Sequence, residues 1–300
     1  MRFSQMNGNW QDVALHLSEV LGRSIRFENI ASVSGGCINQ AWKVTDKKGC
    51  HWFIKTNEPD LQNMFRAESD GLNDIHQSMS VRVPKVFASG ATSAFSYLVL
   101  EYIPLRPSVN QKLMGKQLAQ MHQYTSNSQQ FGWKRDNTIG STVQYNSLSQ
   151  SWLSFWKNER LLFQLNLAKN KGYSNSAFDL GVKLADNLAV FFSDYQPKPS
   201  LVHGDLWGGN CGNDAELNPV IYDPAVYYGD REVDIAMTEL FGGFDGDFYD
   251  TYNESLRLDA GYKTRKVLYN LYHILNHFNL FGGGYATQAE NMTKQLLAEL

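Results

Sequence analysis

The sequence predicts an α+β protein of two lobes: an N-terminal antiparallel sheet with one main helix, and a larger, mainly helical C-terminal lobe. Short apolar runs of strand length, separated by turn residues, dominate the first third of the chain. Apolar residues at helical spacing dominate the remainder. The change falls at Pro104 and Pro107, so we expect lobes spanning residues 1–103 and 104–300.

The N-terminal lobe is expected to begin with a helix over 10–21, which Gly22 ends. A second helix should start at Pro59, in a first-turn position that suits proline, and run to about residue 78. The predicted strands cover residues 25–33, 41–45, 51–55, 84–88 and 97–103. In the C-terminal lobe, helical periodicity covers residues 113–124, 152–168, 178–192 and 267–281.

Charge and composition exclude several classes of partner. The 300 residues carry a net charge of −3 without a run of Lys or Arg, which argues against nucleic acid or an anionic membrane surface. The N-terminus lacks the apolar region of a signal peptide, and no apolar run is long enough to span a bilayer. Three cysteines form no C-x-x-C pair and leave an odd thiol, which favours a reducing, cytoplasmic compartment.

A polar loop between two short apolar runs carries the strongest chemical signal. The loop reads His203-Gly204-Asp205-Leu206-Trp207-Gly208-Gly209-Asn210, and the second run ends at Asp223. Phosphoryl transfer needs this set, because one carboxylate accepts the hydroxyl proton while an amide oxygen and a second carboxylate hold Mg²⁺ on the nucleotide phosphates. The protein-kinase signature has the same spacing from Asp to Asn. Each pair alone is ordinary turn chemistry, so the prediction depends on the whole set.

A glycine-rich turn, Ser34-Gly35-Gly36-Cys37, joins the first two predicted strands and would present backbone N–H groups to phosphate oxygens. By itself it is better interpreted as a plain hairpin turn, since it is neither G-x-G-x-x-G nor a Walker A motif, and the phosphate-binding role depends on the motifs that follow. Lys55 closes the next strand, as V-A-I-K does in kinases, and would reach the α- and β-phosphates. Glu68 in the following helix is its expected partner. An edge-guarding Lys and a surface Glu are the alternatives.

The exit from the last N-terminal strand is the expected adenine site. The backbone groups of Glu101, Tyr102 and Ile103 pass there from a strand into a linker, which leaves them without partners in the sheet. A linker that binds nothing is the alternative.

The segment after Asp223 is short. Asp234 follows so closely that no long activation segment fits, which disfavours a regulated protein kinase acting on a peptide. Asp234 either braces the catalytic loop through backbone N–H groups or serves the dipole of a helix first turn. Aromatic and polar residues at helical spacing follow, forming a sugar-binding wall or a core-facing stripe: Tyr269, Tyr272, His273, Asn276, His277 and Asn279.

Together with Phe241-Gly242-Gly243-Phe244, these motifs resemble the fructosamine (ketosamine-3) kinase family, in order from about residue 25 to the end. The H-G-D-x-x-x-x-N pattern is shared with aminoglycoside phosphotransferases and choline kinases. Trp207, Cys37 and the F-G-G-F segment are more specific to fructosamine kinases. The loop has only Gly35 and Gly36, where some relatives have three glycines.

The resemblance implies a protein-kinase-like two-lobed fold and ATP-dependent phosphorylation of a sugar hydroxyl on a small-molecule or protein-bound ketosamine, a step toward deglycation. Asp205 would be the proton acceptor, with Asn210 and Asp223 as Mg²⁺ ligands. Lys55 with Glu68 would position the phosphates of ATP, and residues 101–103 would form the adenine hinge. Trp207 would stack on the acceptor sugar, and we place His203 beside it on the substrate side.

Two other classes of function remain to be compared. An aminoglycoside or choline kinase would share the catalytic set but line its acceptor pocket with acidic groups, because its acceptors are cationic. A pseudokinase would have lost Lys55, Asp205, Asn210 or Asp223, and all four are present. Cys37 is either a small packing residue or a reactive thiol in a field of N–H dipoles. The resemblance implies a redox-sensitive homodimer, with a monomer as the alternative.

Overall fold

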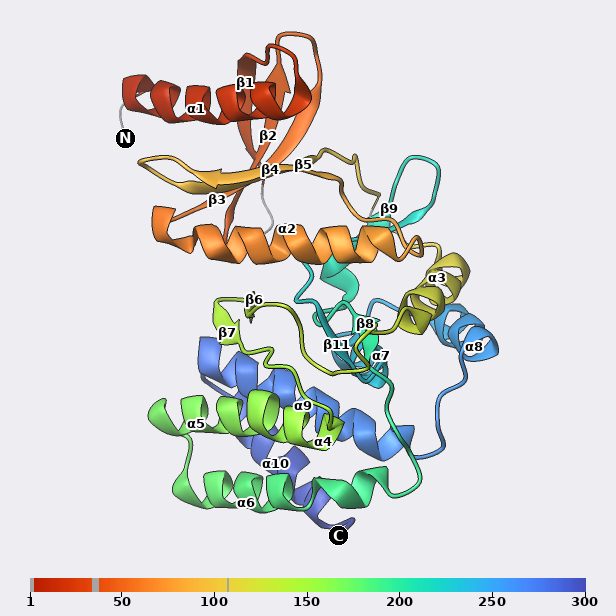
Figure 1. Cartoon of the computed structure of the whole chain (residues 1–300). Coiled ribbons are helices and arrows are strands. Elements are labelled where there is room, and N and C mark those ends of the chain that lie inside the picture. Colours follow the sequence, from red (N-terminus) through yellow and green to blue (C-terminus); the bar gives the residue numbers. More distant parts are fainter. Residues whose placement is uncertain (1–2, 34–37, 107) are drawn as a thin grey trace.

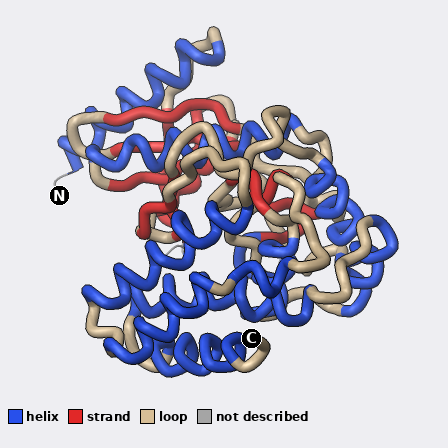
Figure 2. The backbone as a smooth tube through the Cα atoms, turned by 60° about the horizontal axis from the view of Figure 1, so that its bottom comes forward, coloured by secondary structure: helices blue, strands red, loops and turns tan. Residues whose placement is uncertain are grey.

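The computed structural model describes residues 3–33, 38–106 and 108–300 of the chain (Figure 1). It has the predicted α+β architecture, in which an N-terminal sheet lies above a larger helical part. The tube view in Figure 2 shows most strands gathered at one end of the molecule. The expected phosphate loop, Ser34 to Cys37, lies outside the described residues.

The N-terminal sheet has five antiparallel strands in the order β1-β2-β3-β5-β4. Its strands are β1 (Phe27–Val33), β2 (Gln40–Asp46), β3 (His51–Asn57), β4 (Val86–Ala91) and β5 (Ser96–Glu101). Two helices accompany it, α1 (Phe3–Leu21) and α2 (Gln62–Gln77). All five predicted strands and both helices are present, with bounds that differ by a few residues.

The two helices cover opposite faces of this sheet. Alternate residues of a strand point to opposite faces. Ile54 of β3 therefore packs in a cluster with Val13 and Leu17 of α1. Leu98 of β5 packs instead in the main core with Phe65 of α2. Lys55 follows Ile54, so its side chain points to the α2 side, where Glu68 lies.

The C-terminal part begins with α3 (Gln111–Gln123) and contains three two-stranded ribbons. Its strands are β6 (Asn137–Ile139), β7 (Thr142–Gln144), β8 (Ser200–Val202), β9 (Cys211–Asn213), β10 (Pro219–Ile221) and β11 (Tyr227–Gly229). Its other helices are α4 (Trp152–Phe155), α5 (Phe163–Asn170), α6 (Asn175–Asp186), α7 (Glu232–Leu240), α8 (Gly246–Ser255), α9 (Tyr262–Phe281) and α10 (Tyr285–Leu297).

Several helix bounds differ from the sequence predictions. The first helix begins at Phe3 rather than residue 10, because Phe3 and Met6 continue the helical spacing of Trp10 and Val13 toward the N-terminus, across Gly8. The helix predicted over 152–168 contains a π-helical stretch, Trp156–Leu162, and the one predicted over 178–192 breaks at Asn187 into a 3₁₀ turn. We did not predict α8 and α10. Within the described part of the chain, none of the helices has the length and apolarity that a bilayer crossing requires.

Candidate active site

The predicted catalytic loop lies between two strands of the C-terminal part. The loop follows β8, which pairs with β11 in antiparallel register. This pairing brings the start of the loop beside the segment that follows Asp223, and the N–H of Ala225 donates to the carbonyl of His203 at 2.8 Å. Asp205 and Asp223 are therefore held on two backbone segments that hydrogen bond to each other.

Gly204 is required by this close approach. Its φ of +82° lies in the left-handed region, and a Cβ at this position would overlap the carbonyl oxygen of Ala225. An L-residue here would be strained and would push the two segments apart. The His-Gly-Asp sequence thus has a structural reason for glycine at the position where protein kinases carry Arg.

Asp234 braces the loop, which decides between the two roles that the sequence left open. Its carboxylate accepts the backbone N–H of His203 at 2.7 Å and that of Gly204 at 2.8 Å. His122 of α3 also bonds to Asp234, at 3.1 Å. Burial alone would raise the pKa of Asp234, but these donors and the nearby histidines outweigh it and lower the pKa, so the brace stays ionised.

Asp205 has the electrostatic character of a base that works near neutral pH. Burial and the charge of Asp223 raise the pKa of Asp205 to about 7, although the hydrogen bond from Asn210 opposes this. Asn210 Nδ2 donates to the carbonyl of Asp205 at 2.9 Å and to its Oδ2 at 3.2 Å. This bond fixes both side chains of the predicted pair.

Asn210 and Asp223 fit the expected magnesium site. Since Asn210 donates through Nδ2 toward Asp205, its amide oxygen is left for another partner. Asp223 is 44% exposed, and only its Oδ1 is engaged by Lys55 among the described residues. Mg²⁺ keeps several waters and binds through one or two carboxylates plus substrate phosphates. A single carboxylate and one amide oxygen are sufficient for that role.

Lys55 and Glu68 are brought together as predicted. Lys55 Nζ lies 2.6 Å from Glu68 Oε1 and 2.5 Å from Asp223 Oδ1. Burial alone would lower the pKa of Lys55, but the two carboxylates outweigh it and raise the pKa above its ordinary value. A charged Lys55 therefore links the N-terminal sheet to the Asp223 segment.

The predicted hinge residues follow the end of β5. Glu101 remains in the sheet, its N–H donating to the Lys85 carbonyl at 2.8 Å. Its side-chain carboxylate accepts a hydrogen bond from Arg82 at 2.7 Å. Within the described chain, no residue pairs with the backbone of Tyr102 or Ile103, which leaves their polar groups for a ligand.

The structure argues against the substrate-side role that we gave His203. The side chain is fully buried, and its Nε2 donates to the carbonyl of Tyr222 at 3.0 Å. Its Nδ1 accepts the N–H of Asp205 at 3.3 Å. Burial lowers the pKa of His203, so the ring is neutral. Both nitrogens are used to hold the loop, and none is left to face an acceptor.

Trp207, in contrast, presents an accessible ring. Its side chain is 39% exposed and makes an edge contact with Phe241, with ring centroids 6.5 Å apart. The indole lies over Gly209, where a Cβ would overlap the ring. The backbones of Gly208 and Gly243 also approach closely, since a Cβ on Gly243 would lie 2.7 Å from Gly208 Cα. The two loops together fix the position of the indole.

The helical stripe on α9 is mainly core. Tyr269, Tyr272, His273, Asn276 and Asn279 are buried. His277 is half-buried, and its ring packs on Phe241 with centroids 4.8 Å apart. His277 thus extends the aromatic surface of Trp207, and the sequence signalled it only as one member of a mixed stripe.

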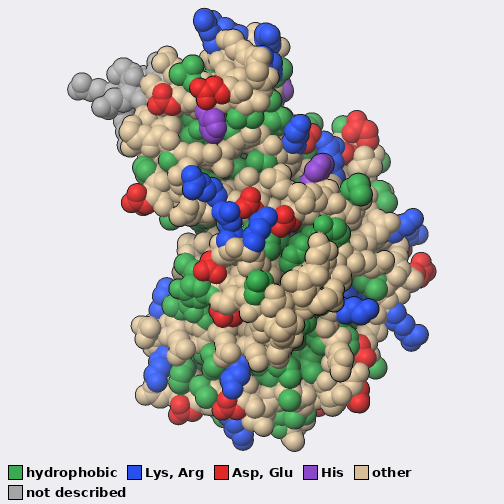
Figure 3. All heavy atoms as spheres, viewed as in Figure 1, with side chains coloured by type: hydrophobic (Ala, Val, Ile, Leu, Met, Phe, Trp, Pro, Cys, Tyr) green, Lys and Arg blue, Asp and Glu red, His purple; other side chains and the backbone are tan. Residues whose placement is uncertain are grey.

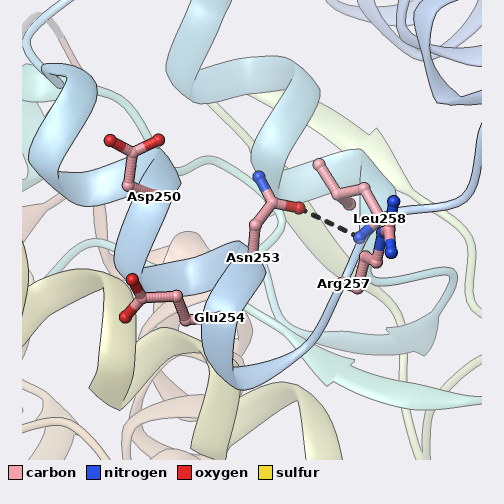
Figure 4. A pocket seen from close by; sticks show the side chains of 5 residues that line it. All are labelled: Asp250, Asn253, Glu254, Arg257 and Leu258. Carbon is pink, nitrogen blue, oxygen red and sulfur yellow. Dashed lines mark hydrogen bonds between the residues drawn. The ribbon is translucent and has the colours of Figure 1, made fainter.

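Two hollows on the surface lie away from the predicted catalytic residues. One lies at the end of α8 and is lined by Asp250, Asn253, Glu254, Arg257 and Leu258 (Figure 4). Its only drawn hydrogen bond is internal, from the Leu258 N–H to Asn253 at 3.0 Å. On the face shown in Figure 3, a group of Lys and Arg side chains lies between the upper and lower parts of the molecule, with acidic side chains beside it.

Comparison with known sequences gives one consistent result. A model of the fructosamine kinase family matches residues 9–299. A probable ketoamine kinase from Synechocystis is 45% identical over 290 residues, covering 96% of this chain and 97% of that protein. A chloroplastic protein-ribulosamine 3-kinase from Arabidopsis thaliana is 39% identical over 281 residues, covering 93% of this chain and 86% of that protein.

Comparison with solved structures agrees with this result. A candidate fructosamine-3-kinase from Haemophilus somnus superposes with a TM-score of 0.88 at 31% identity, covering 97% of this chain and 99% of that one. An ADP-bound aminoglycoside phosphotransferase superposes with a TM-score of 0.62 at 12% identity, covering 93% and 98%. The second likeness shows a shared fold.

Proposed function

The chain belongs to the fructosamine kinase family, and we propose that it transfers the γ-phosphoryl group of ATP to a sugar hydroxyl of a ketosamine, free or protein-bound. The observation that carries the proposal is the convergence of Lys55, Asp223, Asn210 and Asp205 at one place, with the exposed Trp207 two residues beyond Asp205. As a member of this family the chain is a phosphotransferase that uses ATP.

Each residue is assigned a role from its position. Asp205 accepts the proton of the attacking hydroxyl. Lys55, held by Glu68, pairs with the α- and β-phosphates. Of the predicted hinge, 101–103, the backbone of Tyr102 and Ile103 receives the adenine, because the Glu101 N–H is bonded to Lys85. Asn210 and Asp223 would hold Mg²⁺, which would supply charge neutralisation on the phosphates. We place the boundary between the two lobes after residue 103.

The acceptor surface favours a sugar. Trp207, Phe241 and His277 form a continuous aromatic surface beside the base. Indole faces pack on the apolar C–H surfaces of sugars, whereas the cationic acceptors of aminoglycoside or choline kinases call for acidic groups. An aromatic surface therefore supports a ketosamine over an aminoglycoside. It does not separate a ketosamine from choline, because aromatic faces also bind quaternary ammonium groups, so the family match and the screen below decide that alternative.

The test is an ATP-consumption screen. Lysine-linked ribulosamine, erythrulosamine and fructosamine, free and in a peptide, are compared with kanamycin and choline. Asp205→Asn serves as the inactive control, which should lose most turnover yet bind Mg·ATP. Preferred phosphorylation of a ketosamine supports the proposal. Preference for kanamycin or choline would overturn the acceptor class, and full activity of Asp205→Asn would overturn the role of the base.

We also propose that Cys37 confers redox sensitivity, in the cytoplasmic compartment expected from the cysteines. Cys50 and Cys211 are free thiols in the structure. Mild oxidant should reversibly lower activity, and Cys37→Ser should abolish this effect, whereas Cys50→Ser and Cys211→Ser should retain it. Gel filtration under oxidising and reducing conditions separates a linked homodimer from a monomer. Unchanged oxidant sensitivity in Cys37→Ser would reduce Cys37 to a packing residue.

A further inference from the structure

Buried side-chain amides lie directly behind the Asp223 segment. They come from the hairpin of β6 and β7, which supplies Asn137 and Gln144. Gln144 Nε2 donates to the carbonyl of Ala225 at 3.0 Å, and Asn137 Nδ2 donates to that of Val226 at 2.8 Å. These carbonyls follow Asp223 by two and three residues, so the hairpin holds the backbone just beyond the proposed metal ligand.

The segment needs this support because of its backbone conformation. Asp223 has a φ of +58°, in the left-handed region that residues with a Cβ disfavour. Such a conformation persists only where surrounding contacts impose it. On one side, the Tyr222 N–H donates to the carbonyl of Asn210 at 3.0 Å. On the other, Ala225 bonds to His203 through its N–H and to Gln144 through its carbonyl.

Gln144 is itself held in one orientation. The Tyr272 hydroxyl of α9 donates to Gln144 Oε1 at 2.8 Å. Both Gln144 and Asn146 donate to Asn137 Oδ1, at 2.8 and 2.9 Å. Arg160 in turn donates to Asn146 Oδ1 at 2.7 Å. Each amide is thus oriented by the next, and the fully buried guanidinium of Arg160 ends the series.

The tip of the same hairpin approaches the N-terminal part of the chain. A Cβ on Gly140 would lie 3.3 Å from Ile38 Cδ1 and 3.1 Å from Leu280 Cδ1. Ile38 directly follows the glycine-rich turn. The hairpin therefore bonds to the Asp223 segment at its base and approaches Ile38 at its tip.

We propose that the β6–β7 hairpin is a positioning element for phosphoryl transfer and that Gln144 is its central positioning residue. By holding Ala225, Gln144 keeps Asp223 in its left-handed conformation and fixes its distance from the catalytic loop. The segment between Asp223 and Asp234 is too short to provide such support itself, so the hairpin supplies it permanently. This inference rests on the proposed role of Asp223 as a Mg²⁺ ligand.

The test compares Gln144→Met with a matched control, Gln164→Met. Gln164 on α5 is also fully buried, and it bonds to Asn276 and Asn279 on α9. Its side chain also bonds to Tyr272, as that of Gln144 does, but within the described chain it has no bond to the 221–226 segment, so the two variants differ in the bond to Ala225. Both changes remove one buried amide from the same part of the protein. They should therefore cost similar global stability, measured by thermal unfolding.

The two variants should differ in two local readouts. In the ligand-free protein, hydrogen exchange of the amides at 221–226 should accelerate about tenfold or more in Gln144→Met only, because their local opening becomes easier. The Mg²⁺ concentration for half-maximal activity and the KM for ATP should rise about tenfold in the same variant, with the acceptor KM within about twofold of the parent value.

Asn137→Asp provides a second variant if Gln144→Met fails to fold. It keeps the accepting oxygen for Gln144 but loses the donor to Val226. Faster exchange at 221–226 in either variant supports the proposal. Parental exchange and an unchanged Mg²⁺ requirement would overturn it and leave the hairpin a packing element. The exchange measurement needs no substrate, so it stands apart from a failure of the proposed ketosamine activity.

Discussion

At the scale of single residues, the environment of Asp205 predicts a pH profile. Its pKa of about 7 means that a large share of the carboxyl is protonated just below neutral pH, when it is unable to accept a proton. Activity should therefore rise with pH through this range. The kcat/KM for ATP, which reports the free enzyme, should show an acid limb near 7 and fall about tenfold per pH unit below it.

In the pH profiles, the acid limb of kcat should lie at lower pH than the acid limb of kcat/KM. The charge of Asp223 is one cause of the raised pKa of Asp205, and a bound Mg²⁺ would offset it. Initial rates from pH 5 to 9 at saturating and limiting ATP measure both limbs. Two limbs below pH 5 would contradict the environment described for Asp205.

Trp207 and Gly209 give a second prediction at this scale. Trp207→Ala should raise the acceptor KM about tenfold, equivalent to about 1.4 kcal/mol of lost stacking, with the KM for ATP little changed. Gly209→Ala keeps the indole but displaces it, because the added Cβ overlaps the ring. It should therefore raise the acceptor KM in the same direction.

Gly246→Ala is the matched control, since its added Cβ meets nothing within 4 Å. Steady-state kinetics with acceptor and ATP varied in turn separates the two KM values. If Trp207→Ala leaves the acceptor KM unchanged and lowers only the melting temperature, the ring serves packing rather than the sugar.

At the scale of elements, the predicted catalytic loop and the Asp223 segment are in close backbone contact at Gly204 and Ala225. Gly204→Ala should cost about 1–3 kcal/mol of stability through backbone strain and also reduce kcat about a hundredfold by separating the two segments. Gly172→Ala is the control for backbone strain alone. The φ of Gly172 is +93°, similar to that of Gly204, but an added Cβ there would meet nothing within 4 Å.

Gly172→Ala should therefore destabilise the protein without lowering kcat. Thermal unfolding and kcat are measured for both variants. Equal, small effects on kcat would show that the Ala225 carbonyl can move aside without harm.

At the scale of the whole molecule, Arg82 links the N-terminal sheet to the C-terminal part, beside the proposed hinge at 101–103. Its guanidinium donates to Glu101 at the end of β5 and to the buried Asp214 after β9, and its carbonyl accepts the N–H of Ile221. Burial alone would raise the pKa of Asp214, but donors from Asn218 and Arg82 outweigh it and lower the pKa. Stability from these contacts is therefore present at neutral pH and is lost as pH falls below the ordinary carboxyl range.

Arg82→Ala should lower stability by about 1–3 kcal/mol and raise the KM for ATP more than that for the acceptor, because Glu101 loses its partner beside the hinge. The stability of Arg82→Ala should also fall less between pH 7 and pH 4 than that of the parent protein, because the contact with Asp214 is already lost. The control is Arg135→Ala, which breaks an exposed pair with Asp70 and should cost about 1 kcal/mol or less. Thermal unfolding at pH 7 and pH 4 measures the stability of both variants. An Arg82→Ala variant with the parent's stability and KM for ATP would show that Arg82 does not link the N-terminal sheet to the C-terminal part.

The sequence by itself determined the α+β class and the five N-terminal strands, because these depend on local periodicity and on residues close together in the chain. The catalytic role of the loop at 203–210 stays a prediction from the spacing of its residues. Motif order also indicated the pairing of Lys55 with Glu68. Only the tertiary structure showed that Asp234 accepts backbone N–H groups of the loop. It also showed that His203, which we predicted on the substrate side, is buried in the core. It also showed Gln144 behind Ala225, eighty-one residues away. Contacts at such separations are set by how elements pack, and spacing along the chain carries no signal for them.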